Sequence, residues 1–177
     1  LNILGLLDTP TSGSYVLSGV STSTMNDDEM AHIRSTKIGF IFQSFHLIPR
    51  LTAAENVEMP MVLSGLNSKD RKKKVDNALA RVNLTDRSDH RPEQLSGGQR
   101  QRVAIARSIV MEPDVLLADE PTGNLDSTSS KEIIKLIEEL NKGGLTLIVV
   151  THDTDIGSRS ERLIELLDGK IVKDKKN

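Results

Sequence analysis

Three short runs of this chain are apolar at almost every position, and they limit the possible folds more than any other feature. The runs span residues 38–42, 115–118 and 145–150. A strand that is apolar at successive positions is buried on both faces, as in a parallel sheet covered by helices. Helical patterns fill much of the sequence between the runs, so the order of elements predicts an α/β fold with a mostly parallel sheet.

Polar residues follow each of these runs directly or within two positions. Gln43 follows the first run, Asp119 and Glu120 follow the second, and His152 follows the third. In an open α/β sheet, ligands bind outside the carboxyl ends of the strands. We therefore expect these side chains to converge on one site, although any one of them alone is more typical of an ordinary turn.

A glycine loop lies between the first two runs in the sequence. It reads Leu-Ser-Gly-Gly-Gln at residues 95–99, and an amphipathic helical pattern follows it. Ser96 can cap that helix, while Gly97 and Gly98 leave room for a ligand to approach the free backbone N–H groups. Such a helix start suits phosphate, because unpaired donors and the positive end of the helix dipole face the ligand. The alternative for the loop alone is an ordinary capped helix after a turn.

The residues that follow the strands suit phosphoryl transfer from a nucleotide. Asp119 can hold Mg²⁺ through water, since Mg²⁺ keeps most of its hydration shell. Glu120 can polarise an attacking water as a general base. Gln43 can complete the surroundings of the metal or the water, and His152 can donate to the terminal phosphate. The alternative for Asp119 and Glu120 is a solvated strand end before a proline turn.

The remaining helical patterns carry recognisable start signals. Thr52 and Glu55 have the spacing of a capping box, and so do Ser129 and Glu132. Ser68 is expected to cap the helix between them. The predicted helices are residues 24–34, 56–63 after the box at 52–55, 68–82 and 129–141. Pro60 is expected to kink or end the second of them.

The two ends of the chain give weaker patterns. Residues 1–7 resemble the end of a helix, and residues 14–18 a short strand. Near the other end, Asp168-Gly169 separates two apolar runs, which is a strong hairpin signal. We expect this antiparallel hairpin to lie at the edge of the sheet.

Composition excludes several classes of function. The formal net charge of −2 gives no support to sequence-independent nucleic-acid binding, and the absence of cysteine excludes disulfides and cysteine-ligated zinc. The longest apolar runs have the length of strands, so none of them spans a bilayer. A basic run at residues 69–74 is interpreted as a solvated helix face, with a site for an acidic partner as the alternative.

Five motifs together resemble those of the ATP-binding domains of ABC transporters. Residues 95–99 resemble the family's signature, and residues 115–120 its Walker B strand with a catalytic glutamate. Gln43 is similar to the Q-loop glutamine, residues 124–126 to the D-loop, and His152 to the switch histidine. Their order and separation match over the whole chain. The amino-acid sequence of residues 38–49, 55–57 and 119–126 resembles that of the lipoprotein-release and macrolide-efflux branch.

This resemblance implies a P-loop NTPase core with an inserted helical subdomain. The core comprises residues 1–43 and 112–177, and the helical subdomain with the signature loop comprises residues 44–111. The family's Walker A loop, G-x-x-x-x-G-K-[ST], does not occur in the 177 residues. The resemblance places that loop and the adenine-stacking aromatic before Leu1, so the N-terminal part of the core is expected to be missing, apolar surface exposed, and this chain inactive alone.

The resemblance also implies a function and roles for individual residues. Two domains pair head to tail, each ATP lies between the Walker motifs of one and the signature loop of the other, and Mg-ATP hydrolysis drives a membrane permease. The domain then sits at the cytoplasmic face of the cell membrane through that permease. Implied catalytic residues are Glu120 and His152, metal ligands are Asp119 and Gln43, and nucleotide-binding residues are Gln43, Ser96, Gly97, Gly98, Gln99, Asn124 and Asp126.

Part of the helical block is expected to contact the permease. The candidates are Phe45, Ile48, Leu51, Val57 and Met59, and simple packing within the helical block is the alternative reading of them. Two other functions stay open at this stage. One is a non-catalytic partner that lends only its signature loop, which the intact Asp119, Glu120 and His152 disfavour. The other is a soluble ABC ATPase that acts on DNA or ribosomes, whose long coiled-coil insertions are not visible here.

Overall fold

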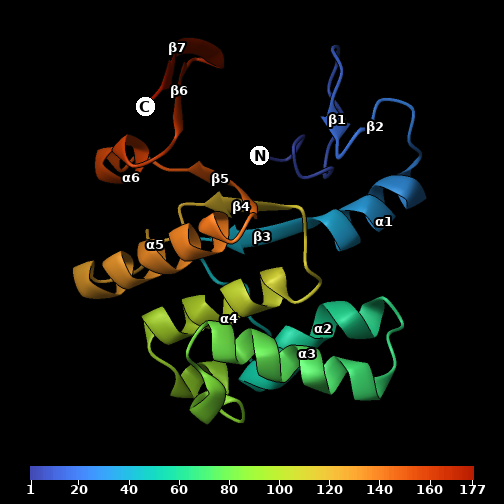
Figure 1. Ribbon diagram of the computed structural model, residues 1–177, viewed down its shortest axis with the longest axis vertical. Coiled ribbons are helices and arrows are strands. Elements are labelled where there is room, and N and C mark those ends of the chain that lie inside the picture. The colour runs from blue at the N-terminus through green and yellow to red at the C-terminus, as the bar shows by residue number, and fades with distance from the viewer.

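A three-stranded parallel sheet lies at the centre of the computed structural model, which describes residues 1–177 (Figure 1). Strand β4 is in the middle and pairs with β3 on one side and β5 on the other. The register sets the last residues of the three strands opposite one another, so all three end at the same edge. The predicted parallel sheet is confirmed. The strands are β3 (Ile38–Phe42), β4 (Val115–Asp119) and β5 (Thr146–Val150).

Burial differs among the three strands. Strands β3 and β4 are largely buried, whereas no residue of β5 is fully buried and Val150 is 45% exposed. Strand β5 pairs only with β4, so its other edge is free. The prediction that the third strand is buried on both faces is therefore wrong for β5.

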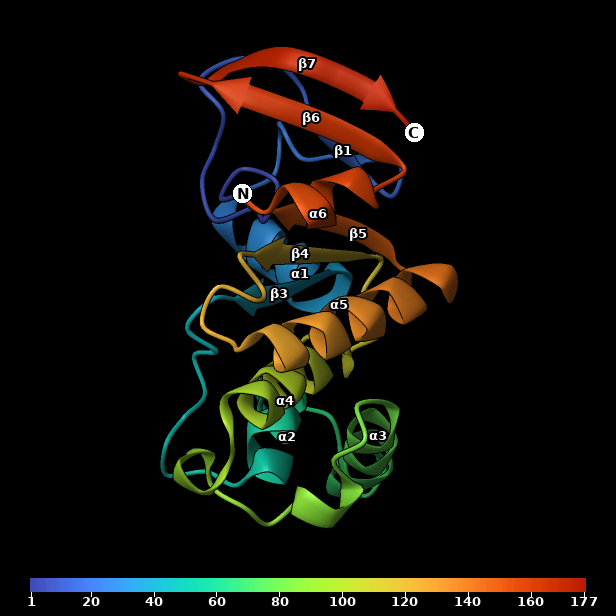
Figure 2. The same cartoon turned by 90° about the vertical axis from the view of Figure 1, so that its left-hand side faces the viewer.

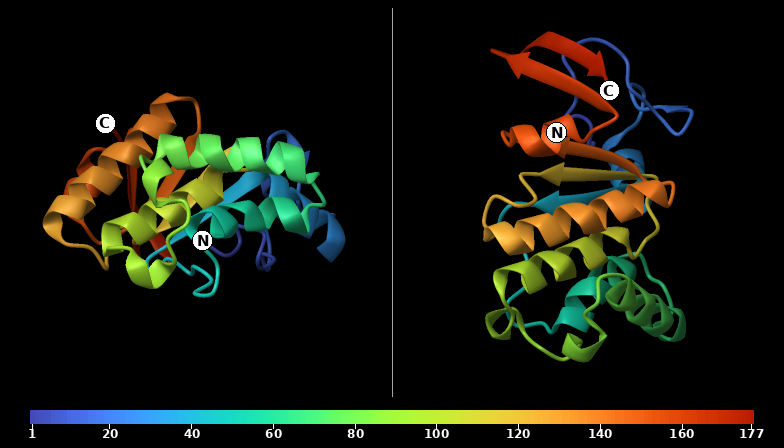
Figure 3. Two further views of the ribbon diagram at one scale, coloured as in Figure 1. Left: turned by 90° about the horizontal axis from the view of Figure 1, so that it is seen from below. Right: turned by 60° about the vertical axis from the view of Figure 1, so that its left-hand side comes forward.

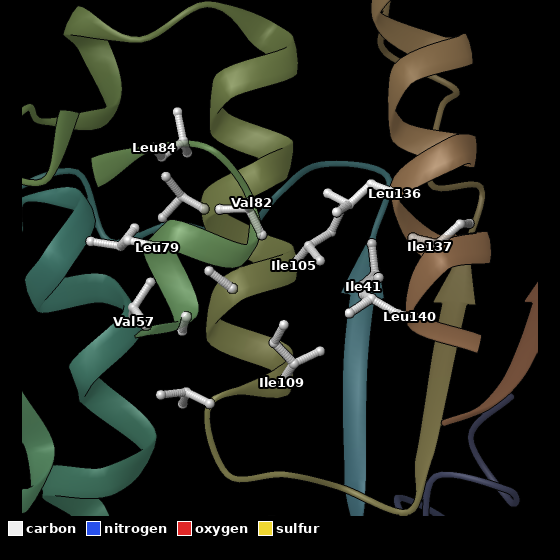
Figure 4. Close-up of a cluster of buried hydrophobic side chains, with 14 of the residues drawn as sticks. Ile41, Val57, Leu79, Val82, Leu84, Ile105, Ile109, Leu136, Ile137 and Leu140 are labelled. Atoms are coloured by element: carbon white, nitrogen blue, oxygen red, sulfur yellow. The ribbon is translucent and has the colours of Figure 1, made fainter. Parts of the chain in front are cut away.

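Helices cover both faces of the sheet (Figure 2). On one face lie α4 (Gly97–Ile109) and α5 (Ser127–Lys142), which pack on alternate strand residues such as Ile41 and Leu116. The main hydrophobic core lies here (Figure 4). On the other face, α1 (Asp27–Lys37) and the N-terminal segment form a smaller cluster around Ile38 and Leu117.

A helical block extends the core away from the sheet (Figure 3). Thr52 and Glu55 form the predicted capping box of α2, whereas Asn67 rather than Ser68 caps α3. The predicted box of Ser129 and Glu132 is also wrong, because α5 begins earlier and a different residue caps it. The block contains α2 (Ala53–Leu63), α3 (Ser68–Arg81), the 3-10 turns η1 (Thr85–Arg87) and η2 (Pro92–Gln94), and α4.

The N-terminal segment keeps its predicted helix end but differs further along. The N–H groups of Gly5, Leu6 and Leu7 donate to the carbonyls of Leu1, Ile3 and Asn2, and Leu6 has a left-handed φ of 55°, which is the pattern of a helix C-terminus. In place of a single strand at 14–18, β1 (Val16–Leu17) and β2 (Val20–Ser21) form a short antiparallel hairpin. Helix α1 begins three residues later than predicted, because Asn26 provides its cap.

The C-terminal segment forms a separate hairpin. After α6 (Thr154–Ser158), strands β6 (Arg162–Leu167) and β7 (Lys170–Lys176) pair around the predicted Asp168-Gly169 turn. They pair with each other alone, so the expectation that they edge the main sheet is wrong. Large apolar side chains, among them Leu166, Leu167 and Ile171, are exposed on this hairpin. No helix has the length and apolar character needed to cross a membrane.

Candidate functional site

Glu120 and His152 meet just beyond the ends of β4 and β5. The backbone N–H of His152 donates to Glu120 Oε1 over 2.9 Å, and His152 Nδ1 lies 2.7 Å from the same oxygen. An ionised carboxylate only accepts hydrogen bonds, so Nδ1 carries the proton that it donates. The hydroxyl of Thr151 donates to Oε2 over 3.1 Å. Three contacts therefore fix the Glu120 carboxylate, whose side chain is 21% exposed.

The backbone at Glu120 is also unusual. Its φ of 45° lies in the left-handed region, which costs a non-glycine residue energy unless its surroundings hold it there. One restraint comes from β5, because the N–H of Glu120 donates to the carbonyl of Val150 over 2.9 Å. The chain thus turns sharply after β4 and aims the Glu120 side chain toward the end of β5.

Gln43 and Asp119 lie at the same edge of the sheet. Asn124 Nδ2 donates to the carbonyl of Gln43 over 3.0 Å, and a Cβ on Gly123 would lie 2.5 Å from Gln43 Nε2. The Gln43 side chain therefore packs against the loop that follows β4. Asp119 is exposed and forms no ion pair. No group of three or more acidic or histidine side chains is placed to hold a metal.

A single exposed carboxylate still fits Mg²⁺. This ion retains several waters and is bound in nucleotide sites through one or two carboxylates together with substrate phosphates. Asp119 has the free acceptor oxygens for such a contact, and Gln43 lies on the neighbouring strand end. A hollow of about 680 Å³ opens beside Asp119 and Val150, lined also by residues 1–4 and Asp8.

The signature-like loop starts α4 with a reciprocal capping box. The N–H of Gln99 donates to Ser96 Oγ over 3.3 Å, and the N–H of Ser96 donates to Gln99 Oε1 over 2.9 Å. A cap of this kind occupies only some of the free donors of a helix start. The N–H groups of Gly97 and Gly98 belong to the same first turn, where no earlier helical carbonyl is available to accept from them.

Gly98 also has a packing role that the sequence did not reveal. A Cβ on Gly98 would lie 3.0 Å from Ser129 Oγ, which is tighter than an ordinary contact, whereas one on Gly97 would lie at an ordinary 3.4 Å from Leu125 Cδ2. The missing side chain of Gly98 thus allows the start of α4 to approach the start of α5. The two helix N-termini lie next to each other for this reason.

Asp126 caps α5. Its carboxylate accepts from the N–H groups of Thr128 and Ser129 over 3.0 and 2.9 Å, and from Ser129 Oγ over 2.6 Å. The hydroxyl of Ser129, followed by the backbone N–H groups, holds the pKa of Asp126 below its ordinary value. The Asp126 carboxylate is thus engaged by its own helix.

Helix α4 contacts the segment after β3 through two arginines. Arg107 Nη2 donates to the carbonyl of Phe45 over 2.8 Å, and Nη1 donates to the carbonyl of His46 over 2.6 Å. The guanidinium of Arg100 lies 5.2 Å from the centre of the Phe45 ring. Burial lowers the pKa of Arg107. Sequence reasoning missed these contacts, because nothing local to α4 indicates its partners.

Gln101 was also missed. It is fully buried on α4, and its Nε2 donates to the carbonyl of Pro121 over 2.7 Å. A glutamine four residues before Ile105, on the apolar stripe of an amphipathic helix, is the signal that could have revealed it.

A larger cleft of about 770 Å³ lies between α1, β3 and the helical block. Of the residues expected to contact a permease, Met59 lines this cleft, Ile48 is 39% exposed, and Phe45 and Leu51 are half-buried. Val57 has no exposed surface and lies within the main core. The expectation for Val57 is therefore wrong, because its side chain is fully used in packing.

A family model described as "ABC transporter" matches residues 1–123. The chain belongs to the ABC transporter family. The macrolide export ATP-binding/permease protein MacB of Burkholderia pseudomallei is 51% identical to this ABC chain over 177 residues, which is all of this chain and 27% of MacB. The uncharacterized ABC transporter ATP-binding protein YvrO of Bacillus subtilis is 47% identical over 176 residues, 99% of this chain and 77% of YvrO. The predicted resemblance is confirmed, and the chain spans about a quarter of the length of its MacB relatives.

Solved ABC structures resemble this chain over almost its whole length. The cassette MJ0796, solved as a dimer in a post-hydrolysis state with ADP and Pi, has a TM-score of 0.86 and 43% identity, and the match covers 99% of this chain and 78% of that one. CbiO1 of Clostridium perfringens, part of an ABC transporter complex, has a TM-score of 0.89 and 31% identity over 99% of this chain and 70% of its own. The α/β ABC ATPase fold is confirmed.

Proposed function

We propose that the chain is the ATP-hydrolysing part of an ABC transporter, with Glu120 as the general base. The observation that carries the proposal is the Glu120–His152 contact beyond two neighbouring parallel strands, on the edge that also presents Asp119. The proposal includes the division into a core of residues 1–43 and 112–177 and a helical subdomain of residues 44–111.

The geometry of Glu120 fits the task of accepting a proton from water. A carboxylate offers about four lone-pair directions, of which His152 and Thr151 use three. One direction on Oε2 is left for the attacking water. His152 keeps the carboxylate oriented through Nδ1, and its exposed ring can donate to the terminal phosphate from Nε2 only in the form that carries a proton on both ring nitrogens.

Mg²⁺ bound with ATP would neutralise the charge that develops on the phosphates. Asp119 would hold the ion through water, and the amide oxygen of Gln43 would complete its surroundings. Gln43 also contacts Gly123 and Asn124 in the loop after β4. A ligand that moved the Gln43 side chain would therefore also move this loop.

The signature loop is proposed to serve a second subunit in a head-to-tail dimer. Gly97 and Gly98 present free N–H groups at the start of α4, where a phosphate is favoured. Ser96, Gln99, Asn124 and Asp126 would line the same contact. The dimeric post-hydrolysis form of MJ0796 with ADP and Pi supports this arrangement.

The partner in the membrane is proposed to dock on the cleft between β3 and the helical block. Met59 lines this cleft, and Phe45, Ile48 and Leu51 belong to the segment that connects β3 with α2. The names of the MacB relatives combine an ATP-binding and a permease function, which supports such a partner at the cytoplasmic face of the membrane. The permease would select the cargo, which is a lipoprotein, a peptide or a drug in this branch.

The test is Mg-ATP hydrolysis by the full-length protein that carries this chain. Replacing Glu120 by Gln removes the base but keeps the size of the side chain, and we expect turnover to fall by about 10²- to 10⁴-fold. Glu93→Gln is the matched control, because Glu93 is exposed and forms no ion pair. Turnover that is unchanged by Glu120→Gln would show that the base is another residue.

A further inference from the structure

Gln101 is the only amide among the buried residues of α4. It lies five residues after Ser96, has no exposed surface, and is surrounded along the helix by buried Val103, Ala104 and Ile105. Its Nε2 donates to the carbonyl of Pro121 over 2.7 Å, and both groups are buried. Pro121 directly follows Glu120 in the chain.

Packing alone does not account for an amide at this position. The other polar atom of the side chain, Gln101 Oε1, is buried and has no hydrogen-bond partner. A buried acceptor without a partner destabilises a fold, so an apolar side chain of similar size would suit the core better. The one contact here that requires an amide is the bond to Pro121.

That bond restrains the strained turn after β4. Glu120 has a φ of 45°, and its own N–H is held by the carbonyl of Val150 in β5. On the other side of Glu120, the Pro121 carbonyl is held by Gln101 in α4. The backbone of Glu120 is thus fixed between β5 and α4, and the hydrogen bond from Gln101 joins this turn to the helix that begins with the signature loop.

We propose that Gln101 is a positioning residue that fixes Glu120 relative to the signature loop of the same chain. This inference rests on the proposed function, in which Glu120 acts on the nucleotide of its own subunit and Ser96 to Gln99 contact that of the partner subunit. Through the Gln101–Pro121 bond, the position of Glu120 at its own subunit's nucleotide then depends on the position of the signature loop at the partner subunit's nucleotide.

The first test is Gln101→Met in the full-length protein, with Gln94→Met as the matched control. Methionine has a similar volume and cannot donate to Pro121, whereas Gln94 is exposed and its side chain accepts only from the N–H of Arg91. We expect kcat to fall about tenfold to 100-fold, as for a slightly misplaced catalytic group, while KM for ATP stays within about twofold. A purely structural role would lower the melting temperature without this selective loss of kcat.

The second test is the pH profile of Gln101→Glu, which decides the matter even where Gln101→Met fails to fold. An ionised carboxylate cannot donate to Pro121, but a protonated one can, and burial favours protonation. We expect the turnover of this variant, relative to the unsubstituted protein, to rise as pH is lowered. A flat relative profile, or an unchanged kcat in Gln101→Met, overturns the inference while Glu120→Gln still tests the proposed function separately. An unsubstituted protein that does not hydrolyse ATP overturns both.

Discussion

Asp126 combines a local structural role with a place in the proposed nucleotide contact. Three donors from the first turn of α5 surround its carboxylate, and the hydroxyl of Ser129 lowers its pKa most strongly. A carboxylate that is bound in this way favours the folded state when it is ionised. Its contribution is present in full above the ordinary pKa of 3.8 and is lost as pH falls through the lower pKa of the folded state.

This linkage gives a pH-dependent prediction for Asp126→Asn. Asparagine is also a good N-cap but does not titrate, so we expect the unsubstituted protein to be the more stable of the two near neutral pH and to lose this advantage below pH 3.8. Melting temperatures measured by circular dichroism from pH 7 to pH 2 give the comparison. Asp76→Asn is the control, since Asp76 is exposed and accepts no side-chain hydrogen bond. A difference that stays constant down to pH 2 would contradict the capping role.

The caps also show which single residues can be predicted from sequence. The boxes of Thr52 with Glu55 and Ser96 with Gln99 depend on residues three apart, so their spacing reveals them. At α5, residues 126–129 are all able to cap, and local sequence does not choose among them. Gln101 was missed for a different reason, because its partner lies 20 residues away in another element.

Helix α4 connects the parts of the proposed site. Its first turn is the signature loop, Gln101 contacts the loop after β4, and Arg107 near its end contacts the segment after β3. That segment contains two successive residues in the left-handed region, Phe45 with φ 59° and His46 with φ 49°. Arg107 binds the carbonyl groups of both, so it holds a strained turn in place.

Removing this arginine should therefore release the turn. We expect Arg107→Met to lower the free energy of unfolding by about 3 kcal/mol, because two hydrogen bonds from a charged donor are lost. The free energy of unfolding of Arg107→Lys should lie between those of the unsubstituted protein and Arg107→Met, since an ammonium group does not present the paired donors of a guanidinium. Urea denaturation of the full-length protein measures both, and Arg81→Met, which changes an exposed arginine without an ion pair, is the control. Equal stability of Arg107→Met and Arg81→Met would contradict the restraint.

At the level of the complete chain, the sequence predicted the parallel sheet but not the surroundings of its strands. Continuous apolar runs identified β3, β4 and β5, and their shared edge followed from the parallel arrangement. Burial of β5 could not be predicted from its own residues, because it depends on whether another strand pairs with its free edge. The same holds for the hairpin of β6 and β7, whose turn is encoded locally while its neighbours are not.

The free edge of β5 and the hairpin leave much apolar surface in contact with water. The exposed fractions are 45% for Val150, 66% for Leu166, 63% for Leu167 and 63% for Ile171. Exposed apolar surface of this kind marks a contact with another segment or molecule. We therefore expect the 177-residue chain to bind a hydrophobic dye strongly, and dye fluorescence as low as that of a well-packed globular protein would contradict this.

The isolated chain should also bind ATP very weakly. No G-x-x-x-x-G-K-[ST] segment occurs in its 177 residues, so the backbone cradle and the lysine that contact the β- and γ-phosphates are not supplied. Asp119 and Gln43 can contribute a few contacts, mainly through a metal ion and water, and these do not replace a phosphate cradle. Isothermal titration calorimetry should give a dissociation constant above about 1 mM, which corresponds to about −4 kcal/mol. Micromolar binding by this chain alone would show that the strand ends and the hollow beside Asp119 hold the nucleotide by themselves.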